Sequence, residues 1–294
     1  MNAKPDLALL RFLRAGAGEV AVLNQSPDGG SSHASADANI DSLPARLVEA
    51  ARALRTAASA DEGGTIAYER IATLPAYARL REIAAELATF DPAALSSRTE
   101  RLAFWINVYN ALAIDAAAQI GLHGSVREQP GFFHRAAYRI GGQRLSLNEI
   151  EHGVLRDNRP PLPRLAVPFA AGDTRLALCI RPPEPRVHFA LHCATHSCPP
   201  LHVYTAANLD AELAAATGDF VRGGGVAFAG ETVRLSAIFA FYAEDFGGRA
   251  GIAAFIGAFL ESDSERRRLN DALRAGREQY ETYDWTLNAA GAGE

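Results

Sequence analysis

The 294-residue sequence has few cysteines, a single lysine and no long apolar run, and each shortage excludes a class of protein. Its three cysteines are an odd number, and a chain of this length can build a core without disulfides, so we expect reduced thiols. No stretch reaches the roughly 18 to 20 apolar residues that a membrane-spanning helix needs, so no membrane span is expected. Nothing at the N-terminus resembles a secretory signal, which predicts a cytoplasmic location.

The charge of the chain argues against a nucleic-acid partner. The formal net charge is −5, Lys4 is the only lysine, and the arginines form no basic stripe. The hydrophobic content of 48% and the charged content of 21% are typical of a globular protein with a full core. The sequence therefore predicts a globular protein that does not bind nucleic acid.

Composition divides the chain into three parts. Residues 1–62 are predicted to be an N-terminal extension with a polar, mobile linker at 25–39 and one helix at 42–58. Residues 63–288 are predicted to form the main domain, and 289–294 a frayed tail. The helix of the extension has an apolar stripe made of Leu43, Leu47, Ala50 and Leu54.

Helical and hairpin signals alternate irregularly along the main domain. Hairpins are expected at 137–146 and 226–236, where glycines mark tight turns, and a further strand pair at 170–180. Helices are expected at 77–87, 97–120, 146–155, 205–220, 237–243, 250–260 and 264–275. This order predicts a single main domain with an α+β fold, in which a small antiparallel-rich sheet is flanked by helices.

Residues 186–204 form the most informative segment, because they hold two of the three cysteines and four of the eight histidines. Apolar side chains alternate with His188, Ala190 and His192, which predicts a strand with a period of two. The pair Pro199-Pro200 would end such a strand. We therefore expect a strand that delivers the Cys193 thiol and a row of imidazoles to the start of a loop, where chemistry is common.

Three interpretations of this segment stay open. Cys193 could be a nucleophile whose thiolate is favoured by a protonated histidine. The cysteines and histidines could instead bind zinc, but His188 and His192 beside a Cys-x4-Cys pair match no standard zinc spacing. Cys193 could also be a small core residue beside histidines with ordinary partners. A redox pair is a weaker fourth interpretation, since no helix N-terminus follows to stabilise a thiolate. We expect no metal and no cofactor.

Two further motifs place polar side chains on helices. Asn107 and Asn110 lie beside the apolar face of the helix at 97–120, so they either tie down neighbouring loops or orient a catalytic imidazole or a substrate carbonyl. Glu149, His152 and Arg156 share one face of the helix at 146–155, where Ser146 and Glu149 form a capping box. That face is either a surface row of ion pairs or a carboxylate that positions His152.

Taken together, these pieces resemble the domain of unknown function 547 family, which is found in bacteria and plants. The resemblance spans about 66–288 and is carried, in order, by the segments 104–112, 145–156, 185–193, 197–201 and 283–288. The activity of that family is unsettled, so the resemblance identifies a domain and not a reaction. It implies that the position of Cys193 is widely cysteine, that serine can replace Cys198, and that Asp115 stands where histidine is common. A required Cys193–Cys198 disulfide or metal pair is therefore not expected.

The sequence as a whole predicts a polar cleft with thiol chemistry. The lead hypothesis is a cysteine-dependent hydrolase or acyl transferase that acts on an amide- or ester-like bond of a small molecule or peptide. Its predicted catalytic residues are Cys193 as the nucleophile, His152 or His188 as the base, and Asn107 or Glu149 as the residue that orients the base. The predicted substrate-binding residues are Asn110, Glu151, His192 and Arg186. The alternative is a non-enzymatic binding or scaffold module whose polar residues fix a groove.

Overall fold

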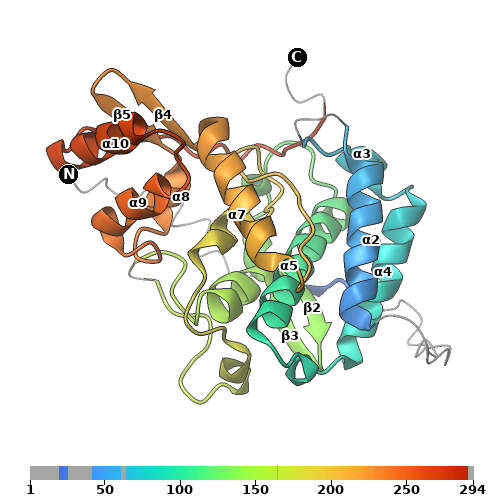
Figure 1. The fold of residues 1–294 in the computed structure, drawn as a ribbon. Coiled ribbons are helices and arrows are strands. Elements are labelled where there is room, and N and C mark those ends of the chain that lie inside the picture. Colours follow the sequence, from blue (N-terminus) through green and yellow to red (C-terminus); the bar gives the residue numbers. More distant parts are fainter. Residues whose placement is uncertain (1–19, 26–41, 61–63, 164, 291–294) are drawn as a thin grey trace.

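The computed structural model describes residues 20–25, 42–60, 64–163 and 165–290 (Figure 1). The mobile linker predicted at 25–39 lies outside the described residues except for Gln25. The frayed tail predicted at 289–294 lies outside them except for its first two residues, and the amide of Ala290 donates to the carbonyl of Ile66.

Helices make up most of the described structure (Figure 1). Most of the predicted helices are confirmed within a few residues of their expected ends. The helices are α2 (Leu43–Ala58), α3 (Tyr68–Ile71), α4 (Pro75–Glu86), α5 (Arg98–Ile120), α6 (Phe132–Arg135), α7 (Leu209–Phe220), α8 (Ala237–Phe241), α9 (Gly248–Gly257) and α10 (Asp263–Ala275). None of the helices among the described residues is both long and apolar enough to cross a membrane.

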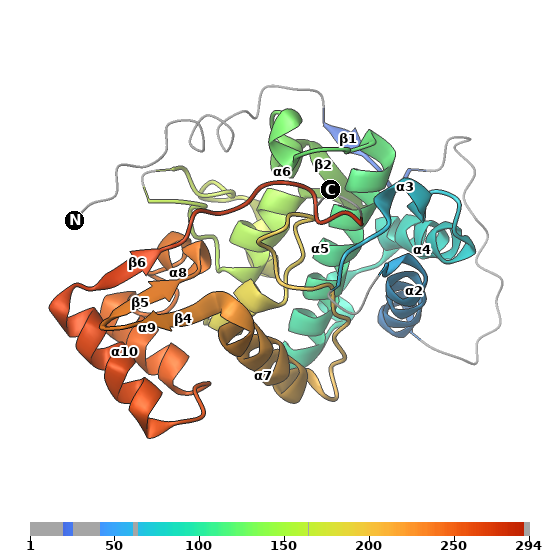
Figure 2. The same cartoon turned by 90° about the horizontal axis from the view of Figure 1, so that it is seen from above.

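Helix α5 lies at the centre of the molecule in both ribbon views (Figures 1 and 2). Ser97 and Glu100 form a capping box at its start, and Gly121 ends it in the left-handed conformation. Every residue from Leu102 to Ala117 is buried, so this helix has no solvent face over that length. Polar side chains on it must therefore find partners inside the protein.

The strands form two small mixed sheets, which confirms the α+β class but differs from the single antiparallel-rich sheet that was predicted. Both predicted hairpins are present, and in each sheet a third strand adds in parallel. At Gly141 in the first hairpin, a Cβ would lie 2.8 Å from the carbonyl oxygen of Phe90, so the turn needs glycine. The strands are β1 (Ala21–Val22), β2 (Ala136–Ile140), β3 (Gln143–Ser146), β4 (Val226–Ala229), β5 (Thr232–Leu235) and β6 (Glu278–Tyr280).

Two predicted strand segments are wrong. The segment with alternating histidines forms a short 3₁₀ helix, η6 (Pro185–Phe189), and 170–180 contains another, η5 (Thr174–Leu178). In η6, Pro185 occupies the first turn and the Glu184 side chain caps it through the amide of Arg186. The alternation does not mark an exposed face, because His188, Ala190 and His192 are as deeply buried as the apolar residues between them.

The buried side chains form two hydrophobic clusters. The larger one surrounds α5, and the smaller one fills residues 226–280, which we call the C-terminal lobe. Phe189 joins that smaller cluster from η6 and packs against Phe239 and Phe255. After β6 the chain returns across the larger part of the molecule (Figure 2). There, bridges pair Ser125 with Thr286 and Thr195 with Leu287.

Helix α2 belongs to the larger core, so the boundary predicted at residue 62 does not separate it from the compact part. It packs against α4 and α5 and buries Leu47, Ala50, Leu54 and Ala58. The predicted apolar stripe of this helix is present, and it packs against other helices of the protein instead of facing solvent.

We expect Leu54→Ala to lower the free energy of unfolding by about 2 to 5 kcal/mol, because Leu54 is 2% exposed and its loss leaves a cavity. Arg52→Ala, on the exposed face of the same helix, should change it by less than about 0.5 kcal/mol. Urea unfolding followed by circular dichroism measures both. Equal, small effects of the two substitutions would show that α2 is an appendage after all.

Candidate functional site

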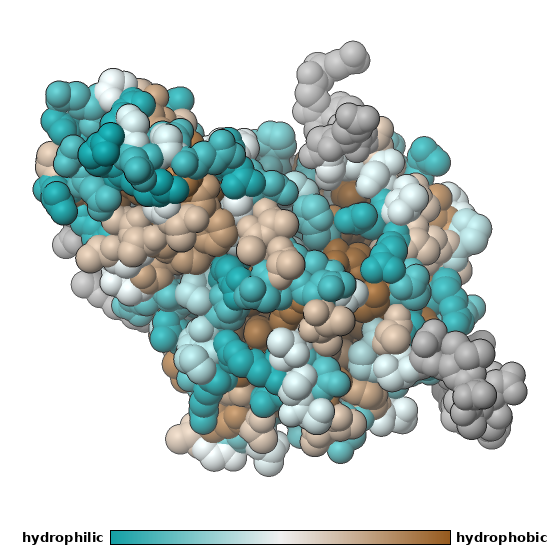
Figure 3. Space-filling model, in the orientation of Figure 1, coloured by the Kyte–Doolittle hydropathy of each residue, from teal (hydrophilic) through white to brown (hydrophobic). Residues whose placement is uncertain are grey.

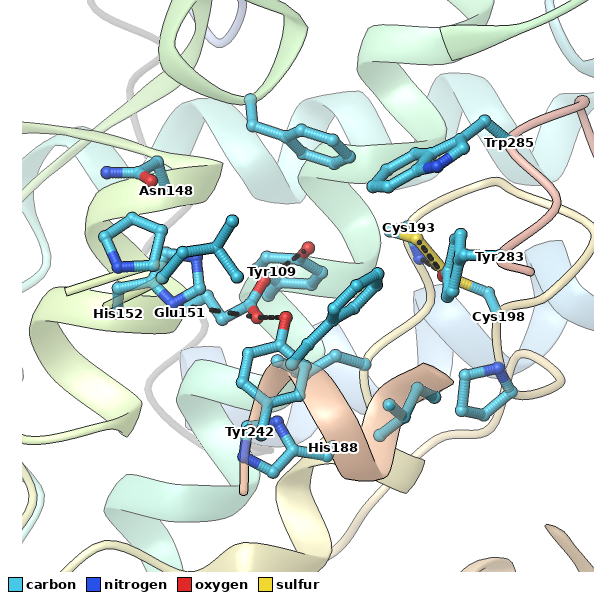
Figure 4. Close-up of a pocket in the computed structure, with 17 residues that line it drawn as sticks. Tyr109, Asn148, Glu151, His152, His188, Cys193, Cys198, Tyr242, Tyr283 and Trp285 are labelled. Carbon is cyan, nitrogen blue, oxygen red and sulfur yellow. Dashed lines mark hydrogen bonds and ion pairs between the residues drawn. A yellow bond between two sulfur atoms is a disulfide. The ribbon is translucent and has the colours of Figure 1, made fainter. Parts of the chain in front are cut away.

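A cavity lies where α5, the π-helix η4 (Glu149–Leu155), η6, α8 and the returning C-terminal segment meet (Figure 4). Its empty space, counting the open solvent at its mouth, amounts to about 780 Å³. Aromatic and aliphatic side chains supply much of the lining. The polar lining consists of Tyr109, Asn148, Glu151, His152, His188, Cys193, Cys198, Tyr242 and Tyr283.

Glu151 is a buried carboxylate held by two phenols. The Tyr109 hydroxyl donates to Oε2 at 2.9 Å, and the Tyr242 hydroxyl donates to Oε1 at 2.7 Å. Burial alone raises the pKa of this carboxyl, but its interactions with His152, Tyr242 and Arg156 outweigh burial, so the pKa lies below its usual value. Burial raises the pKa of both tyrosines, which therefore keep their protons. Glu151 is thus an ionised acceptor at the cavity wall.

His152 is a neutral imidazole whose tautomer is fixed by Arg156. The guanidinium nitrogen Nη1 of Arg156 lies 2.8 Å from Nδ1 of His152. Because a guanidinium can only donate, Nδ1 accepts and the ring proton lies on Nε2. Burial lowers the pKa of His152 to about 3, although Glu151 opposes that effect. His152 therefore acts as a hydrogen-bond donor near neutral pH and not as a base through Nε2.

Asp245 of the C-terminal lobe anchors this arrangement. Its carboxylate accepts from Arg156 at 2.5 and 3.1 Å, from Arg159 at 2.7 Å and from Nε2 of His188 at 2.8 Å. Burial opposes ionisation, but the hydrogen bonds from His188 and Arg156 hold the pKa of Asp245 well below its usual range. The His188 ring stacks on Tyr242 with 3.8 Å between centroids. This stacking places the Tyr242 hydroxyl against Glu151.

Cys193 and Cys198 form a disulfide at the opposite wall of the cavity (Figure 4). The expectation of reduced thiols and of no Cys193–Cys198 disulfide is therefore wrong for this state of the protein. The third cysteine, Cys179, is free and buried, and its sulfur contacts the carbonyl of Gly153. The short loop from 193 to 198 brings the sulfurs together because Ala194 adopts a left-handed conformation, with φ of 67°.

The surroundings of the disulfide are hydroxyls. The Tyr283 hydroxyl lies 3.3 Å from both sulfurs and accepts a hydrogen bond from Thr195 at 3.0 Å. Thr195 Oγ1 itself lies 3.3 Å from the Cys193 sulfur. Burial raises the pKa of Tyr283, so its hydroxyl keeps its proton and donates. Among the described residues, the hydrogen bonds of the Cys193 sulfur thus go to hydroxyls, whereas a histidine was predicted beside it.

Of the predicted site residues, only Cys193, His152, His188 and Glu151 line the cavity. Asn107 binds the backbone of Tyr204 through both its donor and its acceptor. Asn110 in the same way binds the carbonyl of Ala190 and the amide of His192. Both asparagines line a separate, smaller hollow between α2, α4, α5 and residues 201–203, near hydrophobic surface visible between α7 and α2 in Figure 3. They tie down loops, as the simpler interpretation predicted.

The remaining predicted residues also have structural partners. His192 is fully buried between the Tyr68 hydroxyl and the carbonyl of Pro199. Glu149 completes the expected capping box with Ser146 and also binds Arg144 and Arg175, so it does not orient His152. Arg186 pairs with Glu184 and Asp210. These three residues are not among those that line the cavity.

Asp115 lies in another network altogether. It accepts from the Tyr77 hydroxyl at 2.6 Å, the Tyr138 hydroxyl at 2.8 Å and Gln119 at 2.8 Å. It is fully buried and does not line the cavity. The residue at this position therefore bears on packing between α4, α5 and β2, and its difference from histidine leaves the cavity intact.

Sequence reasoning missed the tyrosines and Asp245. Tyr109, Tyr242 and Tyr283 contribute hydroxyls to the cavity, but in the sequence they look like ordinary core aromatics. The available signals were in 104–112, where Tyr109 stands between the two asparagines, and in 283–288, which begins with Tyr283. Asp245 gave none, since its partners lie 57 or more positions earlier.

Residues 92–221 match the family model described as "Protein of unknown function, DUF547". The chain contains a DUF547 domain. The matched region supplies Glu151, His152, His188 and both cysteines of the cavity, whereas Tyr242, Asp245 and Tyr283 follow it. The match is shorter than the resemblance predicted over 66–288. No curated protein and no solved structure matches the chain significantly.

The described residues contain no group of three or more histidine, cysteine, aspartate or glutamate side chains arranged to hold a metal ion. The zinc interpretation of the 186–204 segment therefore finds no geometric support there. The cysteine sulfurs are bonded to each other, and His188 and His192 bind Asp245 and Pro199.

We expect Asp245→Asn to lower the free energy of unfolding by about 3 to 5 kcal/mol, because it leaves the buried Arg156 without the carboxylate that it binds directly. Asp219→Asn is a matched control, since the Asp219 side chain is 71% exposed and pairs with Arg222 at the surface. The control should change the free energy of unfolding by less than about 1 kcal/mol. Urea denaturation compares the two variants. If both lose the same small amount, the buried network does not join the lobes energetically.

The stability of the protein should fall as the pH is lowered from about 6.5 to 4.5. His192 has an ordinary pKa of 6.5, and burial lowers it to about 4 in the folded protein. In this window the unfolded chain binds a proton that the folded protein rejects, so protonation favours unfolding. The slope from one such histidine is at most about 1.4 kcal/mol per pH unit. Urea titrations at several pH values should show a shallower slope for His192→Gln. A curve parallel to that of the parent would exclude this role.

Proposed function

We propose that the cavity is the active site of a cysteine-dependent hydrolase or acyl transferase, with Cys193 as the nucleophile once the disulfide is reduced. The observation that carries this proposal is the position of the Cys193 sulfur on the wall of the same cavity that Glu151 and His152 line. A half-buried sulfur at a cavity can reach a bound substrate, whereas a sulfur in a packed core cannot.

The sulfur has partners that favour a thiolate. Tyr283 and Thr195 place hydroxyls 3.3 Å from the Cys193 sulfur, and Tyr283 keeps its proton. A hydrogen bond to the charged form lowers a pKa, so the Tyr283 hydroxyl, which accepts the proton of Thr195 and keeps its own, would lower the pKa of the reduced Cys193 thiol. The thiolate is the form that attacks an acyl carbon.

The opposite wall offers one donor and one acceptor for the substrate. The Nε2–H of His152 would donate to a carbonyl oxygen, and the carboxylate of Glu151 would accept from an N–H or O–H group. An amide- or ester-like group beside a polar substituent offers both a carbonyl oxygen for His152 and an N–H or O–H group for Glu151. His152 thus takes the role of an electrostatic stabiliser in place of the predicted base, and Arg156 takes the orienting role predicted for Asn107 or Glu149.

The leaving group narrows the substrate class. Release of an amine needs a proton, which an imidazole beside the sulfur usually supplies. Here the Cys193 sulfur contacts two hydroxyls, which are weak acids and poor proton donors to an amine. Among the described residues it has no hydrogen bond with an imidazole. Esters and thioesters release an oxyanion or a thiolate, which depends less on protonation by the enzyme than an amine does. We therefore propose ester-like acyl donors ahead of amides.

A second candidate function is a binding module without chemistry. The observation in its favour is the disulfide, which removes the free thiol and fixes the loop at the cavity wall. In that case the cavity would hold a small molecule or peptide segment through Glu151, His152 and the aromatic lining. Cys193 would only shape the wall.

The reduced protein should form an acyl-enzyme with p-nitrophenyl acetate, a chromogenic ester. We expect a burst of p-nitrophenolate and an added acetyl mass on Cys193, read by intact-protein and peptide mass spectrometry. The oxidised protein should show neither, because the disulfide occupies the sulfur. Cys193→Ala should abolish the adduct, and Glu151→Gln should alter its rate by disturbing the two tyrosines.

Cys179→Ala is the matched control, because Cys179 is a buried free thiol outside the cavity. It should leave the burst unchanged. Acetylation that persists in Cys193→Ala, or a reduced parent that forms no thioester with this ester or with an acyl thioester, would reject the enzyme and favour the binding module.

A further inference from the structure

The two sulfurs of the disulfide have unequal surroundings. The backbone N–H of Cys193 donates to the Cys198 sulfur at 2.9 Å, and the Tyr283 hydroxyl contacts the same sulfur at 3.3 Å. In the part of the chain that the structure describes, the hydrogen-bonding contacts of the Cys193 sulfur are with hydroxyls. Both residues are half-buried at the cavity wall, so a reagent in the cavity can reach the disulfide.

We propose that Cys193–Cys198 is a thiol–disulfide exchange site that accepts two electrons from a dithiol, with Cys193 as the attacked sulfur and Cys198 as the leaving thiolate. The amide donor is the reason for this direction. A negative charge on the Cys198 sulfur would receive a backbone N–H and a phenol hydrogen bond, and hydrogen bonds to an anion are stronger than those to a neutral group. A lower pKa of the leaving thiol makes the exchange faster.

The reaction balances in two steps. A thiolate of the dithiol attacks the Cys193 sulfur and forms a mixed disulfide, while the Cys193–Cys198 bond breaks and its electron pair goes to the Cys198 sulfur. The second thiol of the reagent, as its thiolate, then attacks the reagent's own sulfur in the mixed disulfide. The Cys193 thiolate leaves and takes up a proton. The reagent ends as a disulfide and the protein as two cysteines.

Tyr283 and Thr195 form a chain of hydroxyls that supports the leaving sulfur. Thr195 donates to the Tyr283 oxygen, which leaves the Tyr283 proton free to point at a sulfur. Burial keeps Tyr283 protonated, since it raises the pKa of the phenol. Because the hydroxyl lies 3.3 Å from both sulfurs, it can follow the charge from one to the other.

The loop between the cysteines is held in place independently of the disulfide. The Ala194 carbonyl accepts from the amide of Asn288, and the amides of His196 and Ser197 donate to the carbonyls of Thr286 and Asp284. After reduction, these bonds keep the two thiols near each other, so the disulfide can form again within the same site. A disulfide that opens without unfolding its surroundings is suited to exchange.

The exchange does not depend on the acyl transfer proposed above, because it needs no acyl substrate and is read from thiols alone. In a reducing compartment, disulfides are mostly transient and take part in catalysis or redox sensing. A site of this kind would make the availability of the Cys193 thiol follow the redox state of a dithiol partner.

The first test is reduction of the native, full-length protein with dithiothreitol, followed by trapping with N-ethylmaleimide and intact mass. We expect two trapped thiols while the circular dichroism spectrum stays unchanged and the buried Cys179 stays unlabelled. Tyr283→Phe should slow the reduction, because it removes a hydrogen bond that stabilises the leaving thiolate and so raises the pKa of the leaving thiol. Tyr280→Phe is the matched control, since Tyr280 is 41% exposed in β6 and should leave the rate unchanged.

The second test isolates each thiol and remains informative if Tyr283→Phe fails to fold. Iodoacetamide alkylation of Cys193→Ser and Cys198→Ser, measured against pH, gives the pKa of the remaining cysteine of the pair. We expect Cys198 to have the lower value, below the roughly 8.5 of a free cysteine. Glutathione disulfide should leave a stable adduct on Cys193 in Cys198→Ser. A disulfide that dithiothreitol opens only in urea, or a Cys193 thiol that is the more acidic, would overturn the proposal.

Discussion

The buried carboxylate of Asp245 is the interaction on which the rest of the cavity depends. It comes from the C-terminal lobe and binds Arg156, Arg159 and His188, which all precede that lobe. Arg156, once fixed by Asp245, sets the tautomer of His152. His188, fixed in the same way, carries Tyr242 against Glu151. The Asp245 carboxylate therefore determines, through Arg156 and His188, how His152, Tyr242 and Glu151 are arranged on one wall of the cavity.

Such a network has a cost that a hydrophobic wall would not have. Ions lose hydration when they are buried, and their mutual attraction repays this only when each is fully hydrogen-bonded. Asp245 meets that condition, because two guanidinium groups and an imidazole surround it. His188 does not meet it completely, since its Nδ1 is buried and has no hydrogen-bond partner among the described residues. Buried polar atoms without a partner are uncommon in folded proteins.

Local signals in the sequence predicted much of the fold. The capping box at Ser97 and Glu100 and the glycine pair at 141–142 work over a few residues, so helix α5 and the first hairpin could be placed without knowledge of the rest. The prediction of a strand before Cys193 was wrong. A period of two indicates a strand with one solvent-exposed face, but here the side chains of both alternating sets are buried in the protein. Of the site, the reactive residue types could be selected, but not the tyrosines and Asp245, whose contacts span long stretches of chain.

The matched domain ends at residue 221, while the cavity takes part of its wall from the lobe and the segment that follow. Substitutions in the C-terminal lobe can change the shape and the charge of the cavity while residues 92–221 stay the same. They can also change how easily a ligand reaches the disulfide. The match over residues 92–221 alone is therefore a weak guide to what this cavity binds.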